Sequence, residues 1–491
     1  EARRALERAD IPSFPTPSEC VRAFGYLVQR QRLLQNLSRV PPSQAMGIAP
    51  DWDAARAVIE RAAARGSRLL NEAEGKAVLV AAGIPTVRTM AVSTPGEAGA
   101  AAGSMAAAGI ERFAIKVLSD DLVHKSEVGG VVLDLATPAE VELAAARMLE
   151  HVAALRPEAR ITGLSVQEMR RVPRAHELIC GISDDPVFGP AILFGRGGTE
   201  VEVVNDKALG LPPLDMTLAE DMIAATRISR LMAGYRHYPP ANRHAVATIL
   251  VRLAEMARAL PMITELDINP LLADEQEAVA LDARIVISIS RIADPVPNPR
   301  LSIRPYPVEQ EGTMTLRDGR AVFCRPVKPE DAPLYEDFFA SVDPQDLRLR
   351  FFSAMQKVPP AMIASLTQID YARAMAFLAI DPADGRMMGV GRLSIDANGE
   401  KAEYAVMARS DLQGLGVGRG LMERIIAYGR EIGLSEIWGE VLSENRGMLA
   451  LCRKLGFESE AVPGEGIVHV RLPLGSAGAQ PADAPEAAGA R

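Results

Sequence analysis

The decisive stretch of this sequence is Glu403-Tyr-Ala-Val-Met-Ala-Arg-Ser-Asp-Leu-Gln413-Gly-Leu-Gly416-Val-Gly418. Its pattern predicts a strand, a short turn, a glycine-rich loop and then a helix over Arg419–Glu431. Glycines lack Cβ atoms, so the loop backbone can approach a ligand closely. Amides at the start of such a helix favour phosphate. No Lys-Ser or Lys-Thr pair follows the glycines, which excludes a Walker loop, and the late position in the chain argues against a Rossmann loop.

The second informative motif is Asn445-Arg-Gly-Met-Leu-Ala-Leu-Cys452-Arg-Lys-Leu-Gly456-Phe457, an asparagine, a helix, a glycine stop and a new strand. Together the two motifs resemble the coenzyme A loop and the later helix of the GNAT acyltransferase superfamily. The matching positions are Gln413, Gly416 and Gly418 in the loop, and Asn445, Gly456 and Phe457 around the helix. The helix departs from the family pattern at Cys452, where many members have tyrosine.

The resemblance implies acetyl-CoA as the cofactor. Loop amides suit the pyrophosphate, the preceding strand can donate an amide to the thioester oxygen, and the asparagine can bond the pantetheine arm. The expected cofactor-binding residues are Val406, Met407, Ala408, Gln413, Gly414, Gly416, Val417, Gly418, Arg419 and Asn445.

Glu403 is the predicted catalytic base. A free lysine amine has a pKa of about 10.4, so neutralising it at pH 7 costs about 4.6 kcal/mol, and a nearby base is valuable. GNAT protein acetyltransferases place a glutamate at about this position, and apolar flanking residues are expected to raise its pKa by desolvation. The alternative is a solvated glutamate paired with Lys401 or Arg409. Cys452 is a weak donor, so we expect water or the departing ammonium to protonate the thiolate.

Composition limits the class of protein. The chain has 491 residues, is 48% hydrophobic and carries a formal net charge of −9, which fits two to four globular domains and no nucleic-acid partner. Its four cysteines form no CxxC pair, which favours a reducing, cytoplasmic location and no structural zinc. No signal peptide or membrane-spanning run is evident, so no membrane partner is expected. The start at Glu1, without a methionine, predicts that this sequence is the C-terminal part of a longer protein.

The expected fold is a mixed α/β and α+β multidomain chain, in which an ATP-grasp-like synthetase domain precedes a GNAT domain. The alternate prolines of Asp294-Pro-Val-Pro-Asn-Pro-Arg predict an extended spacer, and the Gly, Ala and Pro composition of the end predicts disorder. The predicted segments are 1–48, the remnant of a ligase domain; 49–293, ATP-grasp-like; 294–312, the linker; 313–475, GNAT; and 476–491, the disordered tail.

Several short patterns of the middle segment resemble the nucleotide-binding part of ADP-forming acyl-CoA synthetases. They are Phe113-Ala-Ile-Lys116, His124-Lys-Ser-Glu-Val-Gly-Gly130, Phe194-Gly-Arg-Gly-Gly198, Glu265-Leu-Asp-Ile-Asn269-Pro and Leu281-Asp282-Ala-Arg. The resemblance implies ATP and Mg²⁺ as ligands, with Lys116, His124 and Glu168 at the nucleotide and Asn269 and Asp282 at the metal.

His124 falls at a position that relays phosphate in active synthetases, but a lone histidine is more often structural. We interpret His176 and Cys180 as structural too, because no partner pattern surrounds them. The main phosphohistidine of active synthetases belongs to a domain outside this sequence, so ligase turnover by this chain alone is not expected.

The whole order of motifs resembles Pat, a family of bacterial protein lysine acetyltransferases that join a synthetase-like region to a GNAT domain. The resemblance implies acetylation of a lysine on a protein substrate, chiefly an AMP-forming acyl-CoA synthetase. Two alternatives stay open: a bifunctional ADP-forming acetate–CoA ligase and acetyltransferase, and a binding protein with two regulatory sites. A homo-oligomer is compatible with each of them.

Overall fold

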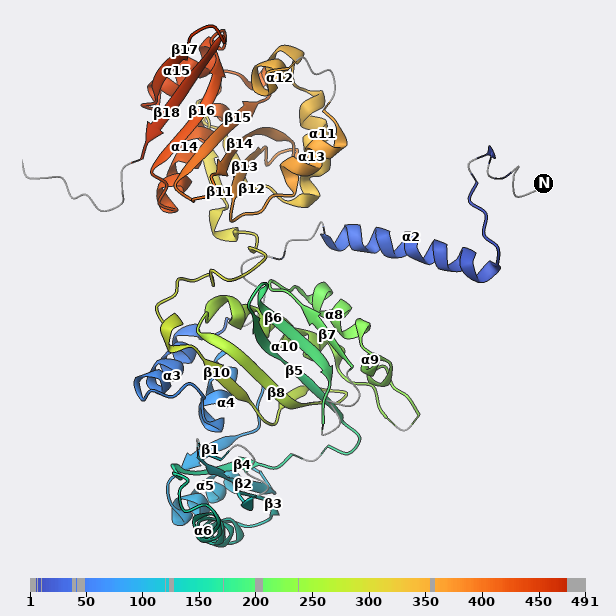
Figure 1. Cartoon of the computed structure of the whole chain (residues 1–491), viewed down its shortest axis with the longest axis vertical. Coiled ribbons are helices and arrows are strands. Elements are labelled where there is room, and N and C mark those ends of the chain that lie inside the picture. The colour runs from blue at the N-terminus through green and yellow to red at the C-terminus, as the bar shows by residue number, and fades with distance from the viewer. Residues whose placement is uncertain are drawn as a thin grey trace, which may run out of the picture. The chain divides into compact units, whose positions relative to one another are not determined.

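The computed structural model describes residues 6, 8–9, 11–37, 41, 49–119, 121–122, 128–170, 172–198, 206–236, 238–353 and 358–474. The chain divides into two compact units, Gln44–Ile303 and Arg304–Arg491 with Glu1–Ser43 (Figure 1). None of the helices in the described part is long and apolar enough to cross a membrane. The predicted tail, 476–491, lies outside the described residues.

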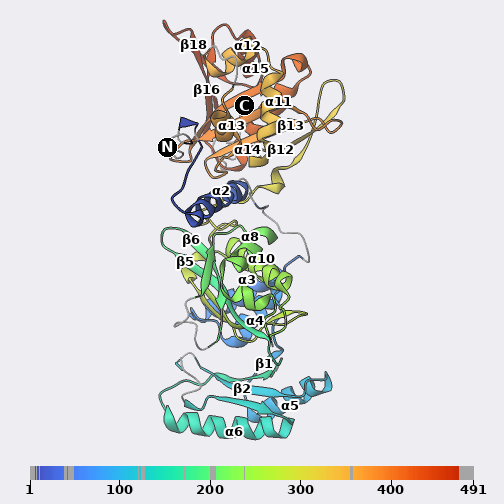
Figure 2. The ribbon, with the colours of Figure 1, turned by 90° about the vertical axis from the view of Figure 1, so that its right-hand side faces the viewer.

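The unit Gln44–Ile303 contains a small antiparallel sheet in the order β1-β4-β2-β3. Helices α5 and α6 pack together and cover one face of this sheet (Figure 2). In β2 every side chain except that of Lys116 is buried, so the strand presents one lysine from an apolar core. The elements are β1 (Thr89–Val92), α5 (Pro95–Ala107), β2 (Phe113–Leu118), β3 (Val131–Leu135), α6 (Pro138–Leu155) and β4 (Gly163–Glu168).

A second antiparallel sheet of the same unit has the order β10-β8-β5-β6-β7, and β9 pairs with β8. Its core surrounds α10, whose N-cap is Asn242, and α4 starts with a capping box at Asn71. The elements are α3 (Trp52–Ala64), α4 (Glu72–Ala81), β5 (His176–Asp185), β6 (Gly189–Arg196), β7 (Lys207–Gly210), α8 (Met216–Ala225), α9 (Ile228–Met232), α10 (Arg243–Ala259), β8 (Ile263–Ala273), β9 (Ala278–Ala280) and β10 (Arg284–Ile287).

The proline-rich segment after β10 differs from the extended spacer expected from its composition. Asn298 is 4% exposed, and its amide nitrogen donates to the Ala257 carbonyl at the end of α10 over 2.9 Å. Leu301 is buried as well. Hydrogen bonding and burial therefore fix this part of the segment on the first unit, which proline content alone did not reveal.

The second unit is built on a sheet in the order β11-β12-β13-β14-β15-β16-β18-β17, antiparallel except for β15 and β16. The elements are α2 (Pro17–Leu37), β11 (Gly312–Thr315), β12 (Ala321–Pro326), α11 (Ala332–Ala340), α12 (Pro344–Phe351), α13 (Pro360–Thr367), β13 (Ala374–Ile380), β14 (Met387–Ile395), β15 (Lys401–Ala408), α14 (Val417–Glu431), β16 (Glu436–Leu442), α15 (Arg446–Lys454), β17 (Glu458–Val462) and β18 (Ile467–Pro473).

Strands β15 and β16 pair only at their beginnings, from Lys401–Glu436 to Glu403–Trp438. Beyond this point the ring of Tyr404 occupies the space beside Gly439, where a Cβ atom would lie 2.6 Å from the ring. The two strands therefore diverge around an aromatic wedge. Alternate residues of β15 face opposite sides: Tyr404 packs in the core under α14, and Met407 packs in the core with α11 and α13.

Candidate active site

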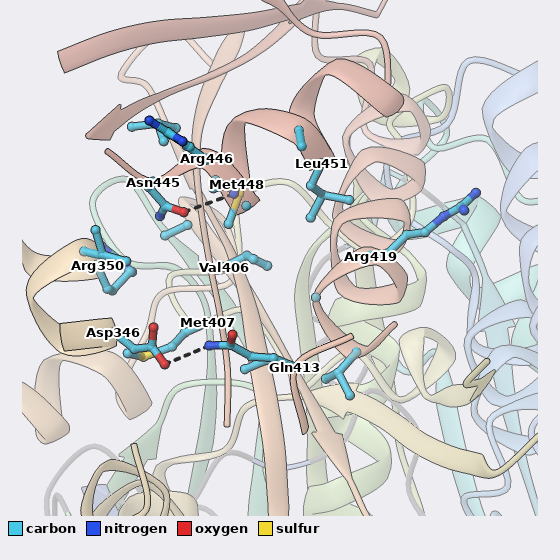
Figure 3. Close-up of a pocket in the computed structure, with 18 of the residues that line it drawn as sticks. Asp346, Arg350, Val406, Met407, Gln413, Arg419, Asn445, Arg446, Met448 and Leu451 are labelled. Atoms are coloured by element: carbon cyan, nitrogen blue, oxygen red, sulfur yellow. Dashed lines mark hydrogen bonds between the residues drawn. The ribbon is translucent and has the colours of Figure 1, made fainter. Parts of the chain in front are cut away.

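A cavity of about 850 Å³ lies where β15 and β16 diverge. It is lined by β15, the glycine loop, the start of α14, the last turns of α12 and the start of α15 (Figure 3). Every predicted residue of this unit lines it: Glu403, Val406, Met407, Ala408, Gln413, Gly414, Gly416, Val417, Gly418, Arg419 and Asn445. The fold thus gathers residues from 403 to 445 around one volume large enough for a cofactor arm.

The glycine loop has the backbone that its sequence predicts. Gly414 and Gly416 have φ of +84° and +99°, values that L side chains rarely adopt. Gly416 is the N-cap of α14, which begins at Val417, two residues before the predicted start. Helix amides therefore open directly onto the cavity, an arrangement suited to phosphate. Gly418 is less constrained, since a Cβ atom there would only touch Val406 at 4.0 Å.

Two predicted residues of the loop have side chains engaged with the protein. Gln413 donates to Asp346 over 2.8 Å, and Asp346 also accepts from Ser410 over 2.6 Å, which ties the loop to α12 (Figure 3). The guanidinium of Arg419 pairs with Glu423 at 2.8 Å. The Gln413 side chain therefore holds the loop in place. Because the Arg419 side chain is paired, the backbone of Arg419 is the part that can contact the cofactor in this arrangement.

Asn445 has a structural task beside the predicted one. Its Oδ1 accepts from the Met448 amide over 3.0 Å and caps α15 (Figure 3). The cap turns the residue toward the cavity that it lines. Its amide nitrogen still has the donors needed for a pantetheine carbonyl.

Glu403 is exposed and lines the cavity. Both partners that the alternative interpretation required are engaged elsewhere: Lys401 pairs with Glu436 at 3.0 Å, and Arg409 with Asp411 at 2.9 Å. The expectation of desolvation by neighbouring residues is wrong, because Ala402 and Tyr404 are buried on the opposite face of β15.

Arg350 is the charged neighbour of Glu403 that the sequence did not reveal. It lines the same cavity from α12 (Figure 3). Burial lowers the pKa of Arg350, and the Glu403 carboxylate opposes that shift. The cavity therefore holds a guanidinium and a carboxylate of opposite charge.

Cys452, which replaces the tyrosine of many GNAT members, is fully buried. Its Sγ lies 3.0 Å from the hydroxyl of Tyr404, which lines the cavity and is itself 6% exposed. Burial raises the pKa of both groups. The thiol is therefore a packing partner of the wedge, in keeping with the expectation that it does not act as the acid.

The predicted nucleotide site of the other unit is arranged differently. The ammonium of Lys116 lies 2.8 Å from Glu72 and 3.3 Å from Asp282. Glu72 is buried and also pairs with the buried Lys76 at 2.9 Å. A predicted phosphate ligand and a predicted metal ligand therefore contact each other through a network that the sequence did not reveal.

The other predicted metal ligand lies close by. The Leu281 amide donates to the Pro270 carbonyl over 3.1 Å, which places Asn269 and Asp282 on adjacent segments. Asn269 accepts from the Gly198 amide over 3.3 Å. Two oxygen donors beside a lysine fit a magnesium-bound phosphate, although the described residues contain no cluster of three or more His, Cys, Asp or Glu side chains suited to a metal.

The other residues predicted for this unit are two nucleotide ligands, Glu168 and His124, and two structural residues, His176 and Cys180. Glu168 is at the end of β4, where its carboxylate accepts from the Arg88 amide over 3.3 Å. His124 lies outside the described residues. His176 and Cys180 are buried, and His176 bonds the Pro239 carbonyl over 2.9 Å, in line with structural roles.

Comparison with known proteins identifies both units. The model of the ATP-grasp domain matches residues 61–287, and that of the acetyltransferase (GNAT) family matches 345–457. The chain is 34% identical over 233 residues to the acetate–CoA ligase (ADP-forming) I subunit beta of Pyrococcus furiosus, which covers 48% of this chain and 97% of that subunit. It is 33% identical over 164 residues to an acetyltransferase of Pseudomonas aeruginosa, 33% of this chain and 88% of that protein. The chain belongs to both families.

A longer relative, acetate–CoA ligase (ADP-forming) I of Archaeoglobus fulgidus, is 33% identical over 287 residues. The match covers 58% of this chain but only 40% of that ligase. The expected fold, an ATP-grasp-like region followed by a GNAT domain, is confirmed. The second unit carries a GNAT acetyltransferase domain, for which acetyl-CoA is the acetyl donor, and the ATP-grasp domain of the first unit implies ATP and Mg²⁺.

Proposed function

We propose that this acyltransferase moves the acetyl group of acetyl-CoA to the side-chain amine of a lysine on a protein substrate. The observation that carries the proposal is the convergence of the glycine loop, β15 and Glu403 on one cavity, with both alternative partners of Glu403 paired elsewhere. The nature of the acceptor rests on the resemblance to the Pat family, which favours an AMP-forming acyl-CoA synthetase.

The proposed reaction uses this chain's own groups in sequence. Glu403 takes a proton from the lysine ammonium, directly or through a water. The amine nitrogen then bonds the thioester carbon, and a β15 amide stabilises the oxyanion. The carbon–sulfur bond breaks, the acylated nitrogen loses its second proton, and the leaving coenzyme A thiolate takes a proton from that nitrogen or from water. The products are acetyl-lysine and coenzyme A.

The test is incubation of the chain with labelled acetyl-CoA and an AMP-forming acyl-CoA synthetase, without ATP. We expect label on a single lysine by mass spectrometry, and none when that lysine is replaced by arginine. Binding of acetyl-CoA without transfer to any protein lysine would refute the proposal.

A second candidate function comes from the ATP-grasp unit, which matches nearly the whole Pyrococcus subunit. We propose that this unit binds Mg-ATP as a regulatory ligand and makes no acyl-CoA by itself. Such a ligand alters acetyl transfer only to the extent that it binds two states with different affinity. Formation of acetyl-CoA from acetate, ATP and coenzyme A by this chain alone would replace the proposal with the bifunctional one.

A further inference from the structure

In the described part of the chain, no helix shares a core with β16, β18 and β17 on the sheet face that carries Glu403. The helices that share a core with this half of the sheet, α14 and α15, pack on the other face with Ile437, Val470 and Cys452. The opposite face carries exposed side chains, which strand register arranges in rows. The first row runs across four strands from the proposed base: Glu403, Trp438, Arg471 and Glu458.

A second row of the same face consists of Glu440, His469 and Glu460. Glu440 also lines the cofactor cavity, so the face is continuous with the reaction site. A hollow of about 240 Å³ lies between the rows and is lined by Trp438, Glu458, Glu460 and His469 among others. The hollow and the cofactor cavity therefore share strand β16, which contributes Trp438 to the hollow and Glu440 to the cavity.

The charge of this face is predominantly negative. Lys401 pairs with Glu436 at 3.0 Å, and Arg471 with Glu458 at 3.0 Å, so both cations are matched. Glu440 lies 3.4 Å from His469, which carries charge only when protonated. Glu403 and Glu460 have no ion pair among the described residues. Glu403 shares its cavity with Arg350, whereas the carboxylates of Glu440 and Glu460 have no permanent counter-charge among the described residues and lie beside the half-buried Trp438.

We propose that this face binds the segment of the acceptor protein around its target lysine, and that it selects segments with a nearby arginine or lysine. The inference rests on the proposed function and names its acceptor class. Complementary charge would hold the cationic neighbour against Glu460 and Glu440, and Trp438 can stack on a guanidinium. Strands lie about 4.8 Å apart and extended chains rise about 3.3 Å per residue, so a cation at Glu440 or at Glu460 lies about two to five positions from the target lysine.

The test compares three peptides, each with one acceptor lysine, flanked at those positions by arginine, alanine or glutamate. With wild-type chain we expect the lowest KM for the arginine-flanked peptide and the highest for the glutamate-flanked one. The preference should shrink as salt rises, because exposed charges are screened.

Reversing the charge of one residue of this face tests whether the face causes the preference for arginine-flanked peptides. Glu460→Arg should raise the KM for the arginine-flanked peptide about fivefold, the scale of two exposed pair interactions, with kcat unchanged. It should leave the alanine-flanked peptide unaffected. Glu336→Arg, an exposed glutamate of α11 that lines neither hollow, is the matched control and should change nothing.

Binding without turnover gives an independent readout. The chain has two tryptophans, Trp52 in the other unit and Trp438 here. An arginine-flanked peptide whose lysine is already acetylated should change the fluorescence of wild type and not of Trp438→Phe. Equal KM values for all three peptides, or an equal rise in KM in Glu336→Arg, would overturn the inference. The proposal of lysine acetylation would be unaffected. A small polyamine acetylated in preference to every peptide would also overturn it. Absence of any lysine acetylation would overturn both proposals.

Discussion

The two predicted sites of this chain show opposite ways of keeping polar groups inside a fold. In the acyltransferase unit the cavity is open, and its predicted residues present glycine amides, the start of α14 without a side-chain cap, and one exposed carboxylate. In the ATP-grasp unit the predicted Lys116 and Asp282 pair with each other, and Lys116 also pairs with the buried Glu72. The open site of the acyltransferase unit can bind a ligand without breaking an ion pair of Glu403. At the site around Lys116, called the closed site below, a ligand must replace existing ion pairs.

The closed site depends on a buried charge network. Burial lowers the pKa of Lys116, but the carboxylates of Glu72 and Asp282 outweigh it and raise the pKa overall. For Lys76 burial prevails over the same glutamate, and its pKa is lowered. Glu72 keeps a lowered pKa despite its burial, because two ammonium groups face it. The network thus holds its charges by mutual compensation, which a phosphate or a metal could replace.

The largest effect is expected at the open site. Glu403→Gln should lower kcat by about 100-fold, since a glutamine cannot accept the proton, with acetyl-CoA affinity unchanged. Initial rates at saturating acetyl-CoA and calorimetric titration measure the two quantities. Glu336→Gln serves as the control for removal of an exposed carboxylate. Wild-type kcat in the Glu403 variant between pH 7 and 8 would mean that the residue is only part of the acidic face.

The next effect tests the glycine loop. Gly416→Val should weaken acetyl-CoA binding by about tenfold or more, because a branched residue is strained at φ +99° and its Cβ would lie 3.3 Å from Arg317. The control is Gly399→Val, a turn glycine with φ +72° and no atom near its Cβ position. Both variants share the backbone strain, so the control separates strain from loss of the binding site. Unchanged acetyl-CoA affinity in a folded Gly416 variant would contradict the assignment of this loop to pyrophosphate binding.

A smaller effect is expected at the closed site. Saturating Mg-ATP at about 100 times its Kd contributes about 2.7 kcal/mol of stability, a rise in Tm of about 5 to 10 °C for a unit of this size. Lys116→Ala and Asp282→Ala should each remove most of this rise, and Lys207→Ala, an exposed lysine of the same unit, should keep it. If Mg-ATP leaves the Tm of the wild-type chain unchanged, the charge network around Lys116 serves only the stability of the fold, and the ATP-grasp unit has no nucleotide site there.

How much could be predicted from the sequence follows from how local each feature is. The glycine loop and the helices after Gly416 and Asn445 depend on residues a few positions apart, so local patterns predicted them. Arg350 beside Glu403 and Glu72 beside Lys116 are brought together only by tertiary packing. No local spacing carries that information. The buried Asn298 shows the same limit, because proline content predicts a spacer but not what it packs against.

The smallest effect concerns the polar pair inside the acyltransferase unit, which resembles the closed site in being buried and mutually satisfied. Tyr404→Phe removes the hydroxyl 3.0 Å from Cys452 but keeps the ring that separates β15 from β16.

Because a buried hydrogen bond is worth about 1 kcal/mol, we expect a slightly lower free energy of unfolding in denaturant titrations and a kcat within about twofold of wild type. Tyr404→Ala, which also deletes the wedge, should destabilise the unit by about 3 kcal/mol or more and lose acetyl-CoA binding. A kcat lowered tenfold or more in Tyr404→Phe, at unchanged stability, would contradict this assignment. The hydroxyl would then be the donor that protonates the leaving thiolate, and the pair would belong to the open site.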